Sequence, residues 1–242
     1  MAWIDLLYPK RCPVCFDALP AGNTLICPEC RQKIRYVSGP TCYACGKPLS
    51  DDTREYCGNC EKKRPPFKKA VAYAEYGSKY MRRLLYEVKY RENCQLLDFP
   101  CLDFALRIKD CVSAWHAEAL VPVPVHEKRK RERGYNQAEE IADRLSKALS
   151  IPVERSLLVR TENTKAQKEL GAEARLANLR NAFSCAKKNT AYHTVILVDD
   201  IYTTGSTACA CTEALLQSGI PEVYFLSLAI GRDFRSSVNP LP

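Results

Sequence analysis

The chain has 242 residues, 46% of them hydrophobic, which suits one large domain or two small ones with a sizeable core. Its formal net charge of +8 favours polyanionic partners such as phosphorylated sugars or nucleic acid. The first residues include Asp5 and no long apolar stretch, so a secretory signal is excluded, and no segment reaches the length of a membrane span. Fourteen cysteines in such a chain predict metal ligands and free thiols, not disulfides.

Eight of these cysteines form four CxxC pairs, and the first members are evenly spaced, since 27−12, 42−27 and 57−42 agree. A CxxC turn directs two thiolates at one metal, and two turns complete a tetrahedral zinc site. We therefore predict two structural Zn²⁺ sites built from Cys12, Cys15, Cys27, Cys30, Cys42, Cys45, Cys57 and Cys60. Pairing of neighbouring turns is favoured, an interleaved pairing is the alternative, and redox-active thiols fit four regular pairs poorly.

A charged, proline-bearing stretch over 61–69 (EKKRPPFKK) marks a domain boundary. The prediction is a double zinc ribbon over 1–64 and an α/β domain over 65–242. A ribbon of this size with few aliphatic residues needs its metal ions, because it is too small to hold a hydrophobic core without them.

Downstream of the boundary, strand-like and helix-like patterns alternate. The predicted elements, in chain order, are a strand over 70–76, helices over 78–90 and 96–108, an apolar run over 119–125 and a helix over 137–149. Pro122 and Pro124 place the apolar run at a strand end or a sheet edge. The alternation predicts an α/β fold with a mostly parallel sheet and helices on both faces.

A basic run, HEKRKRERGYNQ, occupies 126–137 between the apolar run and the helix that follows it. Such a run is usually a solvated basic face. Its position after a strand predicts instead a loop at the strand's carboxyl end, where a pyrophosphate would find cations and backbone donors. The candidate pyrophosphate residues are Arg129, Arg133, Gly134, Asn136 and Gln137.

A short strand over 157–160, a polar segment and a helix over 173–181 come next. Within this region, Gln167 and Arg175 are candidates for a mobile lid that excludes water from a reacting centre. Composition alone favours an ordinary surface loop and helix here.

Residues 195–207, VILVDDIYTTGST, carry the strongest functional signal. Four apolar residues predict a buried strand that ends in the acid pair Asp199 and Asp200, our candidate catalytic residues. A helix start after the loop attracts an anion, so the loop predicts a site for a 5-phosphate formed by Thr203, Thr204, Gly205, Ser206 and Thr207. The acids would repel that anion and therefore need sugar hydroxyls or a divalent metal. The alternative is an ordinary strand, a turn and a capped helix, followed by a last strand over 222–230.

This motif resembles the signature with which type I phosphoribosyltransferases bind phosphoribosyl pyrophosphate (PRPP). The order of the CxxC turns, the ERGYNQ segment and VDDIYTTGST resembles the ComF family, the competence proteins of the ComFC type. The resemblance implies a type I phosphoribosyltransferase fold behind a double zinc ribbon. It implies that Asp199 and Asp200 face the ribose, that 203–207 hold the 5-phosphate, that 129–137 face the pyrophosphate, and that Mg²⁺ accompanies PRPP.

The resemblance also implies a role in DNA uptake during natural transformation or in the use of external DNA. Single-stranded DNA and proteins of the competence machinery are then the expected partners. The expected location is the cytoplasm, with a peripheral place at the inner membrane as an alternative. If the chain is an enzyme, it is a phosphoribosyltransferase, a glycosyltransferase that displaces pyrophosphate from PRPP. A nucleobase salvage transferase and a non-enzymatic module for single-stranded nucleic acid stay open as alternatives.

Overall fold

The computed structural model describes residues 11–12, 14–19, 26–160, 182–186 and 191–232. Its helices are α2 (Pro28–Gln32), α3 (Gly58–Lys62), α4 (Lys79–Tyr90), η1 (Cys94–Leu97), α5 (Asp98–Ser113), α6 (Glu127–Arg133), α7 (Gln137–Leu149) and α9 (Ser206–Gln217). Its strands are β1 (Ala70–Glu75), β2 (Ala119–Pro122), β3 (Leu158–Arg160), β4 (Phe183–Cys185), β5 (Thr194–Tyr202) and β6 (Glu222–Ile230). Among the described helices, none is long and apolar enough to cross a membrane.

Four strands form a fully parallel sheet in the order β1-β6-β5-β2, while β3 and β4 pair as a separate antiparallel ribbon. The central strands β5 and β6 are buried along most of their length and are mainly apolar, as expected of strands covered on both faces. Pro122 ends the edge strand β2, which confirms the predicted place at a sheet edge, where the missing N–H interrupts no inner ladder.

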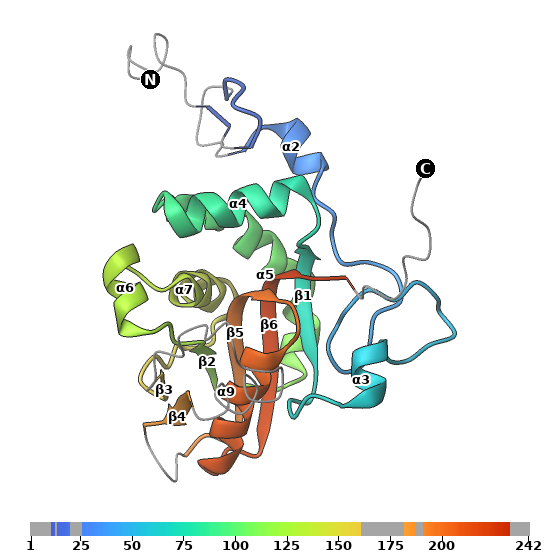
Figure 1. Cartoon of the computed structure of the whole chain (residues 1–242), viewed down its shortest axis with the longest axis vertical. Helices are drawn as coiled ribbons and strands as arrows, with labels where there is room; N and C mark the ends of the chain where they lie inside the picture. Colours follow the sequence, from blue (N-terminus) through green and yellow to red (C-terminus); the bar gives the residue numbers. More distant parts are fainter. Residues whose placement is uncertain (1–10, 13, 20–25, 161–181, 187–190, 233–242) are drawn as a thin grey trace, which may run out of the picture.

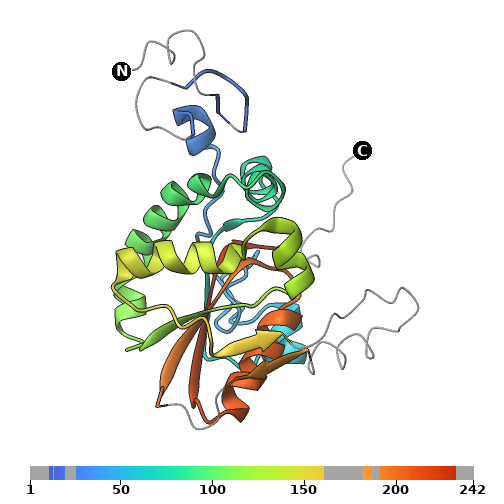
Figure 2. The same ribbon diagram turned by 90° about the vertical axis from the view of Figure 1, so that its left-hand side faces the viewer.

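Side chains of β5 alternate between two hydrophobic cores. Ile196 and Val198 pack into the core that contains α4, α5 and α7, whereas Val195 and Leu197 pack into the core that contains α9. Figure 2 shows α5 and α7 on one face of the sheet and α9 on the other. The predicted fold class, a mostly parallel sheet with helices on both faces and a small N-terminal zinc ribbon, is confirmed.

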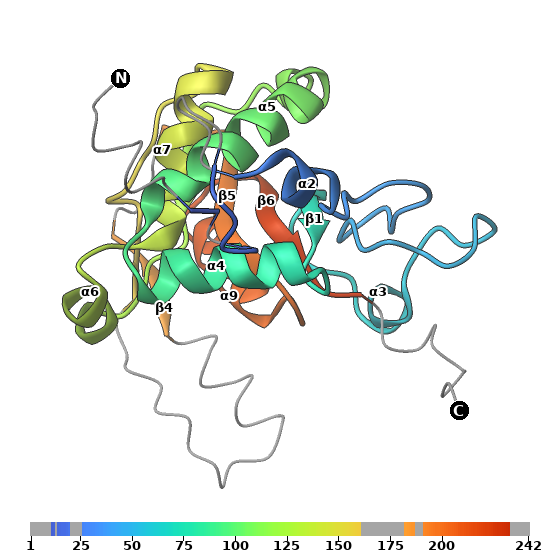
Figure 3. The same ribbon diagram turned by 90° about the horizontal axis from the view of Figure 1, so that it is seen from above.

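The carboxyl ends of the parallel strands lie at one edge of the sheet, and α4 crosses that edge (Figures 1 and 3). Ser78 caps α4, because its side-chain oxygen accepts a hydrogen bond from the Met81 N–H at 3.1 Å. The apolar side of this helix is buried against the sheet and α5. Its other side is left for solvent at the edge where ligands bind in open α/β sheets.

Two predictions about local structure were wrong. The strand of the VILVDDIYTTGST segment does not end at the acid pair, because Ile201 and Tyr202 continue the pairing with β6. The basic run is mainly a short helix, α6, and not a loop. The His126 Nδ1 accepts from the Lys128 N–H at 3.1 Å to start α6, and Gly134 at φ 75° ends it.

The remaining predictions agree with the structure to within a few residues. Helix α7 and strand β6 have the predicted bounds, while α5 runs to Ser113, past the predicted end at 108, because Val112 still packs in the core. The predicted helix over 173–181 lies outside the described residues.

Candidate functional site

The loop between β5 and α9 is built around one glycine. Gly205 has φ 81°, a left-handed conformation, and a Cβ at this position would lie 2.3 Å from the Tyr202 hydroxyl. The loop backbone therefore passes directly over the Tyr202 ring, and only glycine allows that approach. Tyr202 in turn packs edge-on against Phe67 and Phe225, with ring centroids 6.2 and 5.4 Å away. The loop thus rests on a fixed aromatic base.

The start of α9 has few local partners. Gly205 occupies the N-cap position and has no side chain to cap the helix, although Thr204 Oγ1 accepts from the Ser206 N–H at 3.4 Å. Thr204 Oγ1 and Ser206 Oγ lie 2.9 Å apart. A hollow of about 30 Å³ lies within the loop and is lined by Asp199 and residues 201–208. Backbone N–H groups, hydroxyls and the positive end of the helix dipole converge there, which suits an anion.

The two acids near the carboxyl end of β5 lie in different environments. Asp199 Oδ1 accepts a hydrogen bond from the Asp200 N–H at 2.8 Å. Burial, followed by the charge of Asp200, raises the pKa of Asp199 well above its usual value. Asp200, only 9% exposed, forms an ion pair with Lys89 of α4. The site therefore holds one carboxylate that is already neutralised and one that gains from a cation or a hydroxyl donor.

The sequence offered no sign of Lys89. It belongs to no motif, and its helical spacing sets it beside the buried stripe of α4 like many surface lysines. Only the packing of α4 across the carboxyl edge of the sheet brings its ammonium group to Asp200.

Arg160, at the end of β3, connects the acid pair to the basic run. Burial, and then the charge of Arg129, lowers the pKa of Arg160, while the charge of Asp199 acts in the opposite direction. The guanidinium also lies 5.2 Å from the Phe183 ring centroid. Arg129, Arg160 and Asp199 therefore share one electrostatic neighbourhood, although they are far apart in the sequence.

The last turn of α4 also reaches α6. The Arg133 guanidinium lies 5.6 Å from the Tyr90 ring centroid and donates to Gln137 Oε1 at 3.1 Å. Because Tyr90 directly follows Lys89, the acid pair and the end of the basic run flank the same helical turn. The structure thus brings together two segments that the sequence identified separately.

The other predicted pyrophosphate residues have distinct settings. Asn136 is 1% exposed, donates to the Val123 carbonyl at 3.0 Å and accepts from the Ala138 N–H at 3.0 Å, so it fixes the turn between α6 and α7. Gln137 is buried, and its Nε2 has no hydrogen-bond partner among the described residues. Gly134 supplies the left-handed turn that ends α6. The predicted lid residues Gln167 and Arg175 lie outside the described residues.

The eight CxxC cysteines gather into two clusters, and in each the four sulfur atoms lie within 4.8 Å of one another. The first cluster is Cys12, Cys15, Cys27 and Cys30, and the second is Cys42, Cys45, Cys57 and Cys60. The favoured pairing of neighbouring turns is confirmed. Four thiolates at this spacing fit a tetrahedral structural zinc site in each cluster.

The second cluster is joined to the sheet. Gly46, at φ 71°, approaches β1 so closely that a Cβ would lie 2.6 Å from the Ala70 carbonyl oxygen. The Ala70 N–H donates to the Ala44 carbonyl at 2.9 Å. The turn between Cys42 and Cys45 is therefore attached to β1 through the backbone.

Comparison with known proteins finds a family that matches the N-terminal part of the chain and relatives that match nearly all of it. A family described as a double zinc ribbon domain matches residues 3–61. Competence protein F of Haemophilus influenzae is 33% identical over 224 residues, covering 90% of this chain and 96% of that protein. DNA utilization protein YhgH of Escherichia coli K12 is 30% identical with the same two coverages. Competence protein ComFC of Bacillus subtilis is 29% identical over 199 residues, covering 80% and 79%.

Among solved structures, a purine phosphoribosyltransferase from Pyrococcus horikoshii aligns with a TM-score of 0.34 and 18% identity. The alignment covers 56% of this chain and 74% of that chain.

Proposed function

The chain belongs to the competence protein F family, and on that premise we propose that it binds PRPP with Mg²⁺ at the β5–α9 loop and acts in the uptake or use of external DNA. The names of its relatives, competence protein and DNA utilization protein, support the cellular role. One observation supports this ligand: an acid pair near the carboxyl end of a central strand lies close to a helix start whose N-cap is a glycine.

In this proposal, different residues of the site bind the 5-phosphate, the ribose and the pyrophosphate of PRPP. Residues 203–207 hold the 5-phosphate through backbone N–H groups and hydroxyls. Asp199 and Asp200 accept hydrogen bonds from the ribose hydroxyls, and the ion pair with Lys89 holds the Asp200 side chain in place. Mg²⁺, when bound, neutralises the pyrophosphate.

The pyrophosphate lies toward α6 in this arrangement. Arg129 and Arg133 balance its charge, and the Gln137 Nε2 is a spare donor. Asn136 and Gly134 act by shaping the turn after α6. Gln167 and Arg175 remain the proposed lid, and the cytoplasm the proposed location. If the bound PRPP reacts, an acceptor nucleophile forms a bond to C1 as the bond from C1 to the pyrophosphate oxygen breaks and pyrophosphate leaves. The two carboxylates stabilise the positive charge that develops on the ribose.

Calorimetry with PRPP and Mg²⁺ tests the binding. We expect a saturable heat with the wild type and none with Asp199→Ala/Asp200→Ala. The matched control is Asp51→Ala/Asp52→Ala. These two acids are also consecutive in the sequence, but they are exposed and far from the loop in sequence. A wild type that gives no heat, or a control that loses binding equally, contradicts the proposal. Pyrophosphate release across a panel of nucleobases then separates binding from transfer to a base.

The solvent face of α4 favours a second function, the binding of single-stranded DNA. Tyr86 and Tyr90 are 44% and 62% exposed, with ring centroids 5.0 Å apart. Arg83 lies 5.5 Å from the Tyr86 ring centroid, and Arg133 lies near Tyr90. A pair of exposed rings with an arginine near each lets bases stack while the cations neutralise backbone phosphates. We propose that this face is the surface on which a DNA strand lies.

Fluorescence anisotropy with a labelled oligothymidine tests this surface. Because stacking contributes about 1–3 kcal/mol per base, Tyr86→Ala/Tyr90→Ala is expected to weaken binding by about tenfold or more. Leu102→Ala/Leu106→Ala on α5 removes two similarly exposed apolar side chains and serves as the control. Unchanged affinity in the tyrosine variant would contradict the proposal and show that DNA binds to another surface. Addition of PRPP to the bound complex shows whether the two ligands compete.

A further inference from the structure

Two CxxC turns of the ribbon share one hydrogen-bond pattern. In the Cys12 turn, the Phe16 N–H donates to the Cys12 carbonyl at 2.8 Å. In the Cys42 turn, the Gly46 N–H donates to the Cys42 carbonyl at 2.9 Å. The residue after the second cysteine is left-handed in both turns, with φ 68° at Phe16 and 71° at Gly46. The Cys12 turn therefore has a phenylalanine at the position where the Cys42 turn has a glycine.

Phe16 is strained and gains little packing in return. A bulky side chain is rarely found at positive φ, because its Cβ crowds the following carbonyl oxygen. The Phe16 side chain is 54% exposed and belongs to neither hydrophobic core of the described residues. Its carbonyl accepts a hydrogen bond from Arg11 Nη1 at 3.0 Å, but that contact needs only the backbone. Strain that packing does not explain points to a function for the exposed ring.

The Phe16 ring continues the row of aromatic and arginine side chains on α4. The Arg83 guanidinium lies 4.9 Å from the Phe16 ring centroid and 5.5 Å from the Tyr86 ring centroid. An ion pair with Glu87, 2.7 Å between Nη2 and Oε1, holds the Arg83 side chain between the two rings. The Tyr90 ring follows 5.0 Å from Tyr86. The surface proposed for DNA on α4 is therefore continuous with the Cys12 turn.

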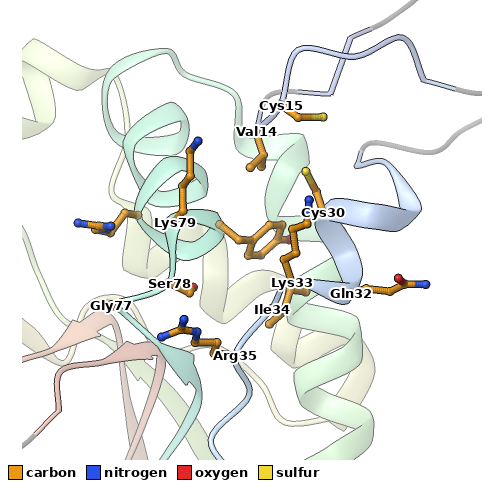
Figure 4. Close-up of a pocket in the computed structure, with 12 residues that line it drawn as sticks. Val14, Cys15, Cys30, Gln32, Lys33, Ile34, Arg35, Gly77, Ser78 and Lys79 are labelled. Carbon is orange, nitrogen blue, oxygen red and sulfur yellow. The ribbon is translucent and has the colours of Figure 1, made fainter. Parts of the chain in front are cut away.

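Basic side chains lie where the Cys12 turn meets α4. A cavity of about 590 Å³ separates the two, and its lining includes four basic residues and no acidic one: Lys33, Arg35, Lys79 and Arg82. Figure 4 shows Lys79 of α4 across from Val14 and Cys15 of the turn. Asp17, which follows Phe16, is the exposed acid closest in sequence. These cations can neutralise the phosphates of a strand whose bases reach Phe16.

We propose that Phe16 is a stacking residue for single-stranded nucleic acid, so that the Cys12 turn binds the same strand as α4. This inference rests on the DNA surface proposed above and extends it from the helix onto the first zinc cluster. Stacking tolerates any sequence, because every base has an aromatic face, so no base preference is expected at Phe16. The four thiolates of the first cluster then fix the turn that presents the ring.

Fluorescence anisotropy of the zinc-loaded full chain with a labelled oligothymidine tests the role of Phe16. Phe16→Gly removes the ring and suits the left-handed backbone, as Gly46 does in the Cys42 turn. We expect about tenfold weaker binding, the effect of losing one stacked base, with zinc content and melting temperature close to those of the wild type. Phe16→Tyr keeps an aromatic face and should bind like the wild type. The control is Tyr43→Ala, which removes a ring that is 62% exposed in the Cys42 turn and should leave DNA affinity unchanged.

The outcomes separate this inference from the proposed surface on α4. Unchanged affinity in Phe16→Gly, with weaker binding in Tyr86→Ala/Tyr90→Ala, would overturn the role of Phe16 and leave the helix surface intact. Weaker binding in Phe16→Gly alone would support Phe16 and overturn the helix surface. Release of zinc by Phe16→Gly together with the loss of binding would overturn the inference, because Phe16 would then support the metal site. A wild type that binds no oligothymidine would overturn both proposals.

Discussion

The two zinc clusters have the same ligands and the same spacing, yet they lie in different surroundings. In the first, Cys15 is exposed, and the cluster packs with Tyr80 of α4. In the second, all four cysteines are buried in the core that holds Phe67 and Tyr202. The same local motif therefore stabilises two parts of the molecule. The first cluster packs against α4, and the second packs in the core beneath the β5–α9 loop.

The local motif therefore defines the metal site, whereas packing defines which part of the protein loses stability when the metal is removed. Loss of the second metal should reach the proposed PRPP site through Phe67 and Tyr202. Loss of the first should reach the start of α4. The following predictions test that contrast, beginning with the largest effect.

Cys42→Ser/Cys57→Ser is expected to abolish cooperative folding of the sheet as well as of the ribbon. Structural zinc binding contributes about 10–16 kcal/mol in small zinc domains, which is comparable to the entire stability of a typical fold. Thermal melting followed by circular dichroism, together with zinc content, measures the effect. Cys111→Ser, a cysteine outside both clusters, is the control. A normal melting transition after loss of this metal would show that the second cluster is independent of the sheet.

Cys12→Ser/Cys27→Ser is expected to release one zinc ion and leave the sheet folded. The melting temperature should fall less than in the second-cluster variant, because only α4 and the ribbon lose their support. PRPP binding should survive, because the β5–α9 loop packs in the other core. Equal damage from both pairs of substitutions would remove the distinction between the clusters.

Gly205→Ala tests whether the loop rests on the second cluster's core. A left-handed φ costs an alanine about 1–2 kcal/mol, and the clash with Tyr202 adds to it, so about 3 kcal/mol of unfolding free energy should be lost. Gly134→Ala is the matched control, since φ is 75° there and a Cβ would meet nothing within 4 Å. Denaturant unfolding of both variants measures the difference, and equal losses would argue against close contact between the loop and Tyr202.

Lys89→Met tests whether α4, which the first cluster supports, also acts on the acid pair. Removal of the ammonium group leaves Asp200 without its partner, and we expect a loss of about 2 kcal/mol, or roughly 4–8 °C in melting temperature. PRPP affinity should fall as well. Lys109→Met on α5 controls for a lost surface charge and should melt like the wild type. An equal fall in the melting temperature of Lys109→Met would show that loss of the ion pair is not the cause of the destabilisation.

Asp199→Asn is expected to have the smallest effect, and a stabilising one. The raised pKa of Asp199 means that its charged form is penalised in the fold, so wild-type stability decreases as pH rises from the ordinary carboxyl value through the raised pKa. The variant lacks that penalty and should melt about 2–4 °C higher at pH 8, with the gap closing toward pH 4. In Asp51→Asn no gain is expected, because hydrogen bonds from Thr53 lower the pKa of Asp51. A pH-independent gain would assign the effect to something other than charge.

Local patterns predicted most of the elements. The apolar residues of α7 repeat at helical spacing and gave its bounds, and the prolines at 122 and 124 identified an edge strand. Patterns failed where backbone and tertiary partners decide the outcome. β5 continues past the acids because β6 offers continued pairing, and α6 forms in a run whose position after a strand predicted a loop.

The sequence by itself determined the metal sites, the parallel α/β fold and the residues of the β5–α9 loop, because each depends on spacing within a few residues. Only the tertiary structure decided which cations meet which anions. Lys89 reaches Asp200, and Arg160 lies within range of the charges of both Arg129 and Asp199. These groups come from segments far apart in the chain, and electrostatic interactions depend on distance in space, which local patterns do not record.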